Sequence, residues 1–214
     1  MDRASDPAAP DPLDPIAEPP PVGLRERKRQ RTRAAIQTEA LRLFTAQGYE
    51  ATTCEQIAAA AEVSPATFYR YFPTKEDVVL ADDYDDLLLA LVQDRPTRES
   101  PVRAVRRSLA AGLEAVYAAD VDAIRERLRL VLSVPALRAR RYEQTRATEA
   151  LLAPELAARM GAAPDDLEVR AVTAAIVGAV VVAVEHWAEY GGALPDLIDQ
   201  ALAALEERLV SRRR

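Results

Sequence analysis

The side chains best suited to bind a charged partner gather in one short run, SPATFYRYFPTKEDV, at residues 64–78. The run contains serine and threonine hydroxyls, two tyrosine phenols and one of the two lysines of the chain. Hydroxyl, phenol and ammonium groups all donate hydrogen bonds to oxyanions. The composition of this run therefore indicates contacts with phosphate oxygens.

Residue types that support catalysis or metal binding are scarce. The chain has one histidine, His186, and one cysteine, Cys54. A histidine-based metal site or a cysteine-only zinc site needs more ligands, and no glycine-rich phosphate loop is present. Four aspartates within residues 82–86 on one predicted helix are expected to face water. We expect no catalytic residue, no metal and no cofactor, so a helical enzyme is the least favoured alternative.

Charge is distributed unevenly along the chain. The net charge is −6, yet residues 25–33, RERKRQRTR, hold six positive side chains and one negative. Residues 1–23 are acidic and rich in proline, which predicts a disordered tail. A local basic stretch is the electrostatic footprint of nucleic-acid binding, which an overall acidic charge conceals.

The elements that position these groups are predicted to be helices throughout. A first helix from Leu24 carries an apolar stripe at three- and four-residue spacing and stops at Gly48. Thr53 opens a second, short helix with a capping box, and Ser64 with Pro65 opens a third. Pro73 ends the third helix, and Thr74 with Asp77 caps a fourth that we expect to reach about Leu91.

The second and third helices form a predicted helix-turn-helix, which explains the aromatic residues of the opening run. Phe68 and Phe72 are four residues apart, so they share the inner face and anchor a helix too short to be stable alone. Thr67, Tyr69 and Tyr71 fall elsewhere, toward solvent or a partner. The outer face can then bond phosphates, and the helix N-terminus can meet base edges.

Residues 31–79, RTRAAIQTEALRLFTAQGYEATTCEQIAAAAEVSPATFYRYFPTKEDVV, resemble the tetracycline-repressor (TetR) family of transcriptional regulators. The resemblance implies an all-α fold, an N-terminal three-helix DNA-binding domain, a helical ligand-binding and dimerisation domain, and repression released by a ligand. It implies that Thr67 lies at a double-stranded DNA operator and that Tyr69, Tyr71 and Lys75 contact phosphates. Glu62 departs from a pattern that often has glycine, and a left-handed backbone there would cost about 1–2 kcal/mol.

The residues at the base-facing positions, Pro65 and Ala66, are apolar, which restricts direct readout to thymine methyl groups or steric exclusion. The DNA-binding residues expected from the basic arm and the resemblance are Arg27, Lys28, Arg31, Arg33, Thr53, Ser64, Pro65, Ala66, Thr67, Tyr69, Arg70, Tyr71 and Lys75.

The chain divides into a tail at 1–23, a DNA-binding domain at 24–80 and a ligand-binding and dimerisation domain at 81–214. In the last part, ERLRLVLSVPALRAR and VEHWAEYGG resemble the family branch with an acyl-CoA-like, mycofactocin-regulator-type domain. Amphipathic patterns predict its helices at 101–117, 120–132, 135–160 with a possible break at Pro154, 165–190 and 195–213.

The helix at 165–190 is apolar nearly all round, so it must be buried, either within one subunit or between two. Alanines recur every four residues from Ala171 to Ala183. Such a ridge permits close approach of another helix, and we expect a homodimer built with the last helix. The expected interface residues are Ala175, Ala179, Ala183, Trp187, Leu202 and Leu205.

The remaining helices offer apolar side chains for a ligand cavity. The expected lining is Leu109, Leu113, Tyr117, Leu128, Val131, Leu132, Val177 and Val181. Arg103, Arg106, Arg107, Arg125 and Arg129 could meet an anionic head group at its mouth. The expected effector is therefore a small hydrophobic molecule or one that resembles an acyl-CoA. A DNA-binding protein without a ligand stays an alternative, because an apolar helical domain need not be hollow.

The sequence also bears on location. Its start is acidic and proline-rich, unlike a signal peptide, and its longest apolar run, at residues 171–184, is shorter than the roughly 20 residues of a spanning helix. We therefore expect a cytoplasmic protein with no membrane partner.

Overall fold

The structure is a computed structural model that describes residues 23–81, 84–117 and 121–210; the side chains of residues 26, 84–86, 113–117 and 208–210 lie outside that description. The described residues form ten helices and no strand. These are α1 (Leu24–Gln47), α2 (Cys54–Ala60), α3 (Pro65–Tyr71), α4 (Lys75–Leu80), α5 (Tyr84–Gln93), α6 (Pro101–Tyr117), α7 (Val121–Ser133), α8 (Pro135–Met160), α9 (Leu167–Tyr190) and α10 (Leu194–Val210).

Local capping fixes the three short helices at the N-terminal end. The side chains of Thr53, Ser64 and Thr74 each accept a hydrogen bond from the backbone N–H three residues on. Thr53 and Thr74 also complete capping boxes, and Pro65 occupies the first turn of α3. These predicted caps are confirmed. They satisfy N–H groups that a helix start leaves unpaired.

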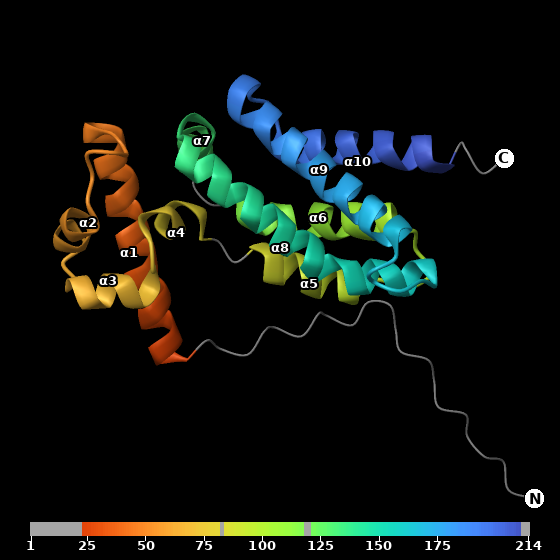
Figure 1. Ribbon diagram of the computed structural model, residues 1–214, viewed down its shortest axis with the longest axis horizontal. Coiled ribbons are helices and arrows are strands. Elements are labelled where there is room, and N and C mark those ends of the chain that lie inside the picture. Colours follow the sequence, from red (N-terminus) through yellow and green to blue (C-terminus); the bar gives the residue numbers. More distant parts are fainter. Residues whose placement is uncertain (1–22, 82–83, 118–120, 211–214) are drawn as a thin grey trace, which may run out of the picture.

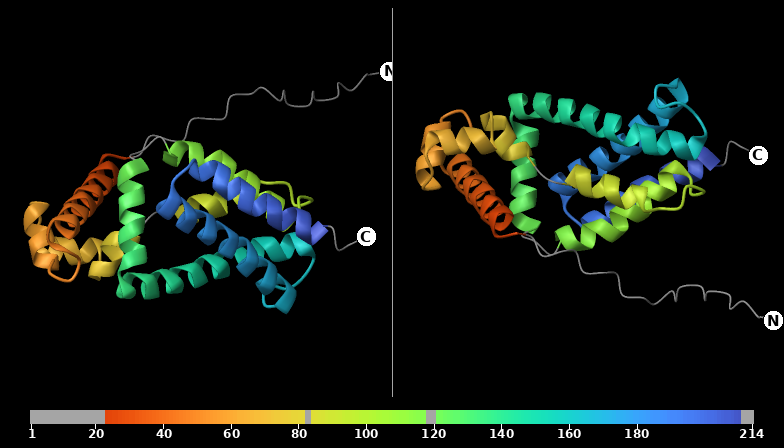
Figure 2. Two further views of the ribbon diagram at one scale, coloured as in Figure 1. Left: turned by 90° about the horizontal axis from the view of Figure 1, so that it is seen from above. Right: turned by 90° about the horizontal axis from the view of Figure 1, so that it is seen from below.

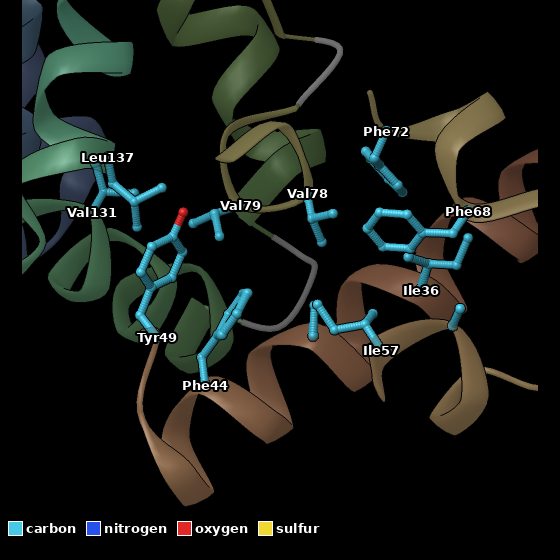
Figure 3. Packing of buried hydrophobic residues seen from close by; sticks show 12 residues of the cluster. Ile36, Phe44, Tyr49, Ile57, Phe68, Phe72, Val78, Val79, Val131 and Leu137 are labelled. Carbon is cyan, nitrogen blue, oxygen red and sulfur yellow. The ribbon is translucent and has the colours of Figure 1, made fainter. Parts of the chain in front are cut away.

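A compact aromatic core holds α1 to α4 together (Figure 3). Phe68 and Phe72 are fully buried, with ring centroids 6.1 Å apart, and they pack with Ile36 and Ile57. At the other end of the cluster Tyr49 folds back onto Phe44, 5.1 Å between ring centroids. Burying a side chain of this size stabilises the fold by about 1.5–3 kcal/mol, so α3 is held from its inner face.

This core does not end at the expected domain boundary. Val131 of α7 and Leu137 of α8 belong to the same buried cluster as Tyr49 and Val79 (Figure 3). Figure 2 shows α7, in green, standing across the molecule between α1–α4 and the blue helices α9 and α10. The two units of the chain therefore share packed side chains at α4, α7 and α8.

Two helix predictions need correction. The helix expected to reach Leu91 ends at Leu80, because Gln37 of α1 donates from Nε2 to the carbonyls of Val78 (3.2 Å) and Ala81 (2.8 Å). The break expected at Pro154 is absent, and α8 continues through it. Pro154 is exposed, so water can satisfy the carbonyl that the missing N–H leaves free.

Candidate nucleic-acid interface and ligand cavity

The outer face of α3 is open to solvent at the extremity formed by α1–α4 (Figure 1). Ser64, Pro65, Ala66, Tyr69 and Arg70 are all exposed. Their exposure follows from the burial of the two phenylalanines on the opposite face. The structure thus brings together, on one short helix, the residues expected to face bases and phosphates.

The hydroxyl groups on this face are ordered but still able to donate. Ser64 Oγ accepts from the Thr67 N–H at 3.1 Å and shares a 2.9 Å hydrogen bond with Thr67 Oγ1. Thr53 Oγ1 accepts from the Gln56 N–H at 3.2 Å. A hydroxyl that accepts a capping bond keeps its own hydrogen. Thr53 and one hydroxyl of the Ser64–Thr67 pair therefore keep a hydrogen for an oxyanion, while the other hydroxyl of that pair donates within it.

The two tyrosines of α3 differ in their surroundings. Tyr69 is 45% exposed and donates to Glu55 Oε1 at 3.3 Å, and hydrogen bonding to Cys54 raises the pKa of its phenol. Tyr71 is only half-buried against the core, with the Arg70 guanidinium 5.5 Å from its ring. Both remain reachable from outside, although Tyr71 is partly a packing residue.

Lys75 does not project from the surface as expected. Its Nζ donates to the carbonyl oxygens of Tyr49 (2.9 Å) and Thr52 (3.2 Å) and lies 4.1 Å from the centroid of the Tyr49 ring. The turn between α1 and α2 presents these carbonyls beside α4, and the Tyr49 carbonyl also accepts from the Thr52 N–H at 3.3 Å. Two of its three hydrogens are engaged within the fold, so the predicted phosphate contact of the Lys75 ammonium would have to use the third.

The basic arm lies on the first half of α1. Arg27, Lys28 and Arg31 are exposed along it. Arg33 is half-buried, with its guanidinium 5.9 Å from the Phe72 ring centroid, so it also supports the aromatic core. Arg27, Lys28 and Arg31 are therefore accessible cations close to the helix-turn-helix, and Arg33 has a second, structural role.

The turn between α2 and α3 contains backbone strain. Glu62 has φ of 54°, which makes it the one non-glycine residue with positive φ in the described ranges. Left-handed backbone is unfavourable for residues with a Cβ. The departure from glycine noted in the sequence therefore falls on a position where glycine would be free of strain.

Other reactive side chains have plain roles. Burial raises the pKa of the Cys54 thiol, which keeps it protonated and unreactive. His186 is exposed on α9, with its ring 4.7 Å from that of Tyr190. Among the described residues, no group of three or more His, Cys, Asp or Glu could hold a metal ion. The side chains of the aspartates within 82–86 lie outside the described part.

A cavity of about 310 Å³ lies among α4 to α10. Five of the eight expected residues line it: Leu109, Leu128, Val131, Val177 and Val181. Leu132 does not, because its position on α7 is turned about 100° from its neighbour in the lining. The side chains of Leu113 and Tyr117 fall outside the described part.

The arginines expected at the mouth of the cavity are engaged elsewhere. Arg103, Arg106 and Arg107 form ion pairs with carboxylates of Glu206, Asp199 and Glu99 respectively, and none of the three lines the cavity. Arg125 and Arg129 both donate to the Ala188 carbonyl. Two arginines do line the cavity. Arg127 was missed, whereas Arg141 belongs to the run RARR at 138–141, for which the sequence leaves a ligand-phosphate role and a surface role equally open.

Sequence reasoning also missed Val79 and Leu80, which line the cavity from α4. Val79 belongs to the buried core beneath α3, and Leu80 packs against that core. Their apolar character was visible, but it indicated only a helix core. Their place at a cavity depends on packing against α7 and α8, far away in sequence.

Known proteins match both halves of the chain. Residues 36–81 match the family described as bacterial regulatory proteins, tetR family, and residues 99–210 match the MftR C-terminal domain. The HTH-type transcriptional regulator TcmR of Streptomyces glaucescens is 42% identical over 151 residues, which is 67% of each chain.

The chain belongs to the TetR family.

Two further relatives agree with this assignment. The transcriptional regulator MftR of Mycobacterium tuberculosis is 27% identical over 163 residues, 75% of this chain and 82% of MftR. The NalD repressor of Pseudomonas aeruginosa has the same fold, with a TM-score of 0.56 and 20% identity over 84% of this chain and 96% of NalD. The protein is thus a TetR-family transcriptional regulator with a C-terminal ligand-binding domain, and it is not an enzyme.

In this TetR-family chain, the six residues expected at a dimer interface do not share one exposed face. Ala183, Trp187 and Leu202 are buried in the subunit's own core, so they cannot meet a second copy directly. Ala179 and Leu205 are half-buried, and Ala175 is exposed. A helix apolar on every side does not reveal which side turns inward.

The exposed face of α9 is itself apolar. Leu167 is 82% exposed and Val182 63% exposed, and Ala171 and Ala175 lie between them on the same stripe. By length and composition α9 could cross a membrane, with a mean hydropathy of 2.1 over its most apolar window. Core helices of soluble proteins meet the same criterion, so a single such helix is weak evidence for a membrane span.

Proposed function

We propose that the protein is a cytoplasmic, homodimeric repressor that binds a palindromic operator through α1–α3 and dissociates when a ligand fills its cavity. The observation that carries this proposal is the double role of α4. Val79 lies in the core that supports α3, and Val79 and Leu80 also line the cavity. A ligand would therefore touch the side chains that position the DNA-reading helix.

A dimer would fix the form of the operator and would also cover the apolar stripe of α9. Two copies related by a two-fold axis would place two copies of α3 on successive half-sites, which requires a palindromic operator. The same association would cover the apolar stripe of α9 from Leu167 to Val182. Exposed apolar stripes of this kind mark interaction surfaces.

DNA contacts would divide into positioning and reading. Arg27, Lys28 and Arg31 would neutralise phosphates, and Tyr69 and Thr67 would bond phosphate oxygens near α3. Ala66, exposed at the first turn of α3, would lie against base edges. It can only contact a thymine methyl or exclude a larger group, so shape should contribute much of the specificity.

The protein would leave its operator if the ligand binds the free arrangement more tightly than the DNA-binding arrangement. A ligand shifts the equilibrium only by its difference in affinity for the DNA-binding and the free arrangement. Occupancy of a cavity bounded by α4 and α7 would favour the arrangement in which these helices are further apart. Repression with ligand release is the mode that the family resemblance implies.

The cavity bears on the effector. Its volume of about 310 Å³ lies at the low end of the range for small-molecule sites. A small apolar molecule or an acyl chain matches this volume, whereas the nucleotide part of an acyl-CoA would have to stay outside. We favour a compact apolar effector over a whole acyl-CoA.

The test begins with operators selected from random DNA by the purified protein. We expect palindromic sequences, and Ala66→Glu should bind them at least tenfold more weakly because it brings a negative charge to the DNA. Ala158→Glu, an equally charged change at an exposed position of α8, should bind as the wild type does. Selection of non-palindromic sequences would contradict the dimer.

The second half of the test concerns release. Hydrophobic compounds that displace the wild type from its operator should fail with Val181→Phe, which fills the cavity without altering α3. If no compound releases the wild type and Val181→Phe behaves identically, the alternative of a ligand-independent DNA-binding protein is favoured.

A further inference from the structure

Most polar side chains in the cavity wall are already satisfied by the protein. Arg141 pairs with Glu185 at 3.0 Å. Gln144, Thr145 and Thr148 each donate to a backbone carbonyl of α4 or α8. Each of these groups therefore already has a partner in the protein, with which a ligand would have to share it.

Two cavity-lining side chains are exceptions. Ser108 of α6 is 1% exposed, and its hydroxyl has no hydrogen-bond partner. Arg127 of α7 is half-buried, and within the described ranges its guanidinium has neither a hydrogen-bond partner nor an ion-pair partner. Buried polar groups are normally paired, so the Ser108 hydroxyl indicates a missing partner. The half-buried Arg127 guanidinium has no partner in the described protein and is free to bind a ligand oxyanion.

The charge of the cavity gives the sign of that partner. Arg127 and Arg141 are the ionisable residues in the described lining, which includes no Asp or Glu. An arginine can only donate hydrogen bonds, and its planar fork fits a carboxylate or a similar oxyanion. A cationic ligand would be repelled, and a neutral one would leave Arg127 unpaired.

The position of Arg127 places the charged end of the ligand. The residue lines both the cavity and a separate hollow formed with Leu41 and Thr45 of α1. It therefore stands at the wall between the apolar interior and the outside. A ligand with one charged end can leave that end at this wall and bury its body, as amphipathic groups do at other boundaries. At about 310 Å³, the space is equivalent to about ten water molecules.

We propose that the effector is a compact, mainly apolar molecule with one anionic group, which Arg127 binds, while Ser108 donates to a second acceptor. This inference rests on the proposed ligand-released function and deepens it by naming the ligand class. Arg127 is thus the residue that makes the cavity selective for anions.

The sole tryptophan, Trp187, is buried and lines the cavity, so its fluorescence reports occupancy without any DNA. We would titrate the full-length protein with decanoate, decan-1-ol and decyltrimethylammonium below their micelle concentrations. Decanoate should bind most tightly. Arg127→Gln should weaken decanoate about tenfold to a hundredfold, the range for losing a charge-assisted hydrogen bond, and leave decan-1-ol unchanged.

Arg138→Gln is the matched control, because Arg138 is exposed on α8 and does not line the cavity. It should bind all three probes as the wild type does. Two results would contradict an anionic effector: equal affinity of the wild type for decanoate and decan-1-ol, or unchanged decanoate binding by Arg127→Gln. Either result would leave the proposed ligand-released function intact. If none of the probes changes Trp187 fluorescence, both proposals fail.

Discussion

Lys75 shows how a residue expected at the DNA can be needed by the fold. Its ammonium donates to the carbonyls of Tyr49 and Thr52, in the turn after α1, and also lies over the Tyr49 ring. The Tyr49 hydroxyl in turn donates to Glu76 Oε1 at 2.7 Å. Burial by itself raises the pKa of Glu76. The hydrogen bond from Tyr49 and the other hydrogen bonds to this carboxylate lower the pKa by more, so the net shift is downward and the carboxylate stays ionised. The cluster fastens α4 to the turn after α1.

The two lysines of the chain allow a matched test. Lys75→Met removes two hydrogen bonds and a cation–π contact, so it should lower the free energy of unfolding by about 1–3 kcal/mol. Lys28→Met, on the exposed arm, should leave stability unchanged and reduce the salt dependence of operator binding by about one unit of slope. Urea unfolding and binding over a salt series measure both quantities. A Lys75→Met variant with wild-type stability and a flattened salt slope would support the phosphate contact instead.

Among the elements, the short helices were the most predictable. Their starts depend on contacts within three residues, as at Thr53, Ser64 and Thr74, and these contacts are visible in the sequence. The end of α4 was not predictable, because Gln37 lies more than 40 residues away from the carbonyls it binds. Local chemistry can be inferred from sequence, whereas a long-range contact that stops a helix cannot.

The same distinction applies to the candidate sites. Phe68 and Phe72, four residues apart, showed which face of α3 is exposed, because the spacing leaves one inner face. The cavity was only partly predictable: Val177 and Val181 were identified, but Arg127 looked like any surface arginine. Periodicity shows that a side is apolar and does not show whether a neighbouring helix fills the space beside it.

The turn of the helix-turn-helix offers a prediction at this scale. Glu62→Gly removes the strain of a left-handed backbone, about 1–2 kcal/mol, but gives back about 0.5–1 kcal/mol through the greater freedom of glycine in the unfolded chain. We expect a net stabilisation of up to about 1.5 kcal/mol, seen as a higher midpoint in urea. Glu50→Gly, at another exposed glutamate with ordinary backbone, should destabilise instead.

At the scale of the whole molecule, α7 links the two halves. Val131 contributes to the core beneath the DNA-reading helices and also lines the cavity. Thr45 of α1 donates to Glu126 of α7 at 3.3 Å, which adds a polar contact across the same junction. A shift of α7 would therefore be felt by α1 and α4 together, and these are the helices that hold α3 in place.

The proposed dimer would form through the exposed stripe of α9. Val182→Glu puts a charge at the C-terminal end of that stripe, and a charge buried in an interface without a partner is strongly destabilising. We expect the variant to be folded and monomeric, and to bind a palindromic operator at least a hundredfold more weakly because its two half-sites no longer act together. Sedimentation and operator titration measure the two effects.

Tyr142→Glu is the control for this change, because Tyr142 on α8 is 68% exposed, close to the 63% of Val182, and lies off the stripe. It should remain a dimer with wild-type operator affinity. A Val182→Glu protein that sediments as a dimer would place the interface on another face. The apolar stripe of α9 would then be free to contact a partner other than a second copy of this chain.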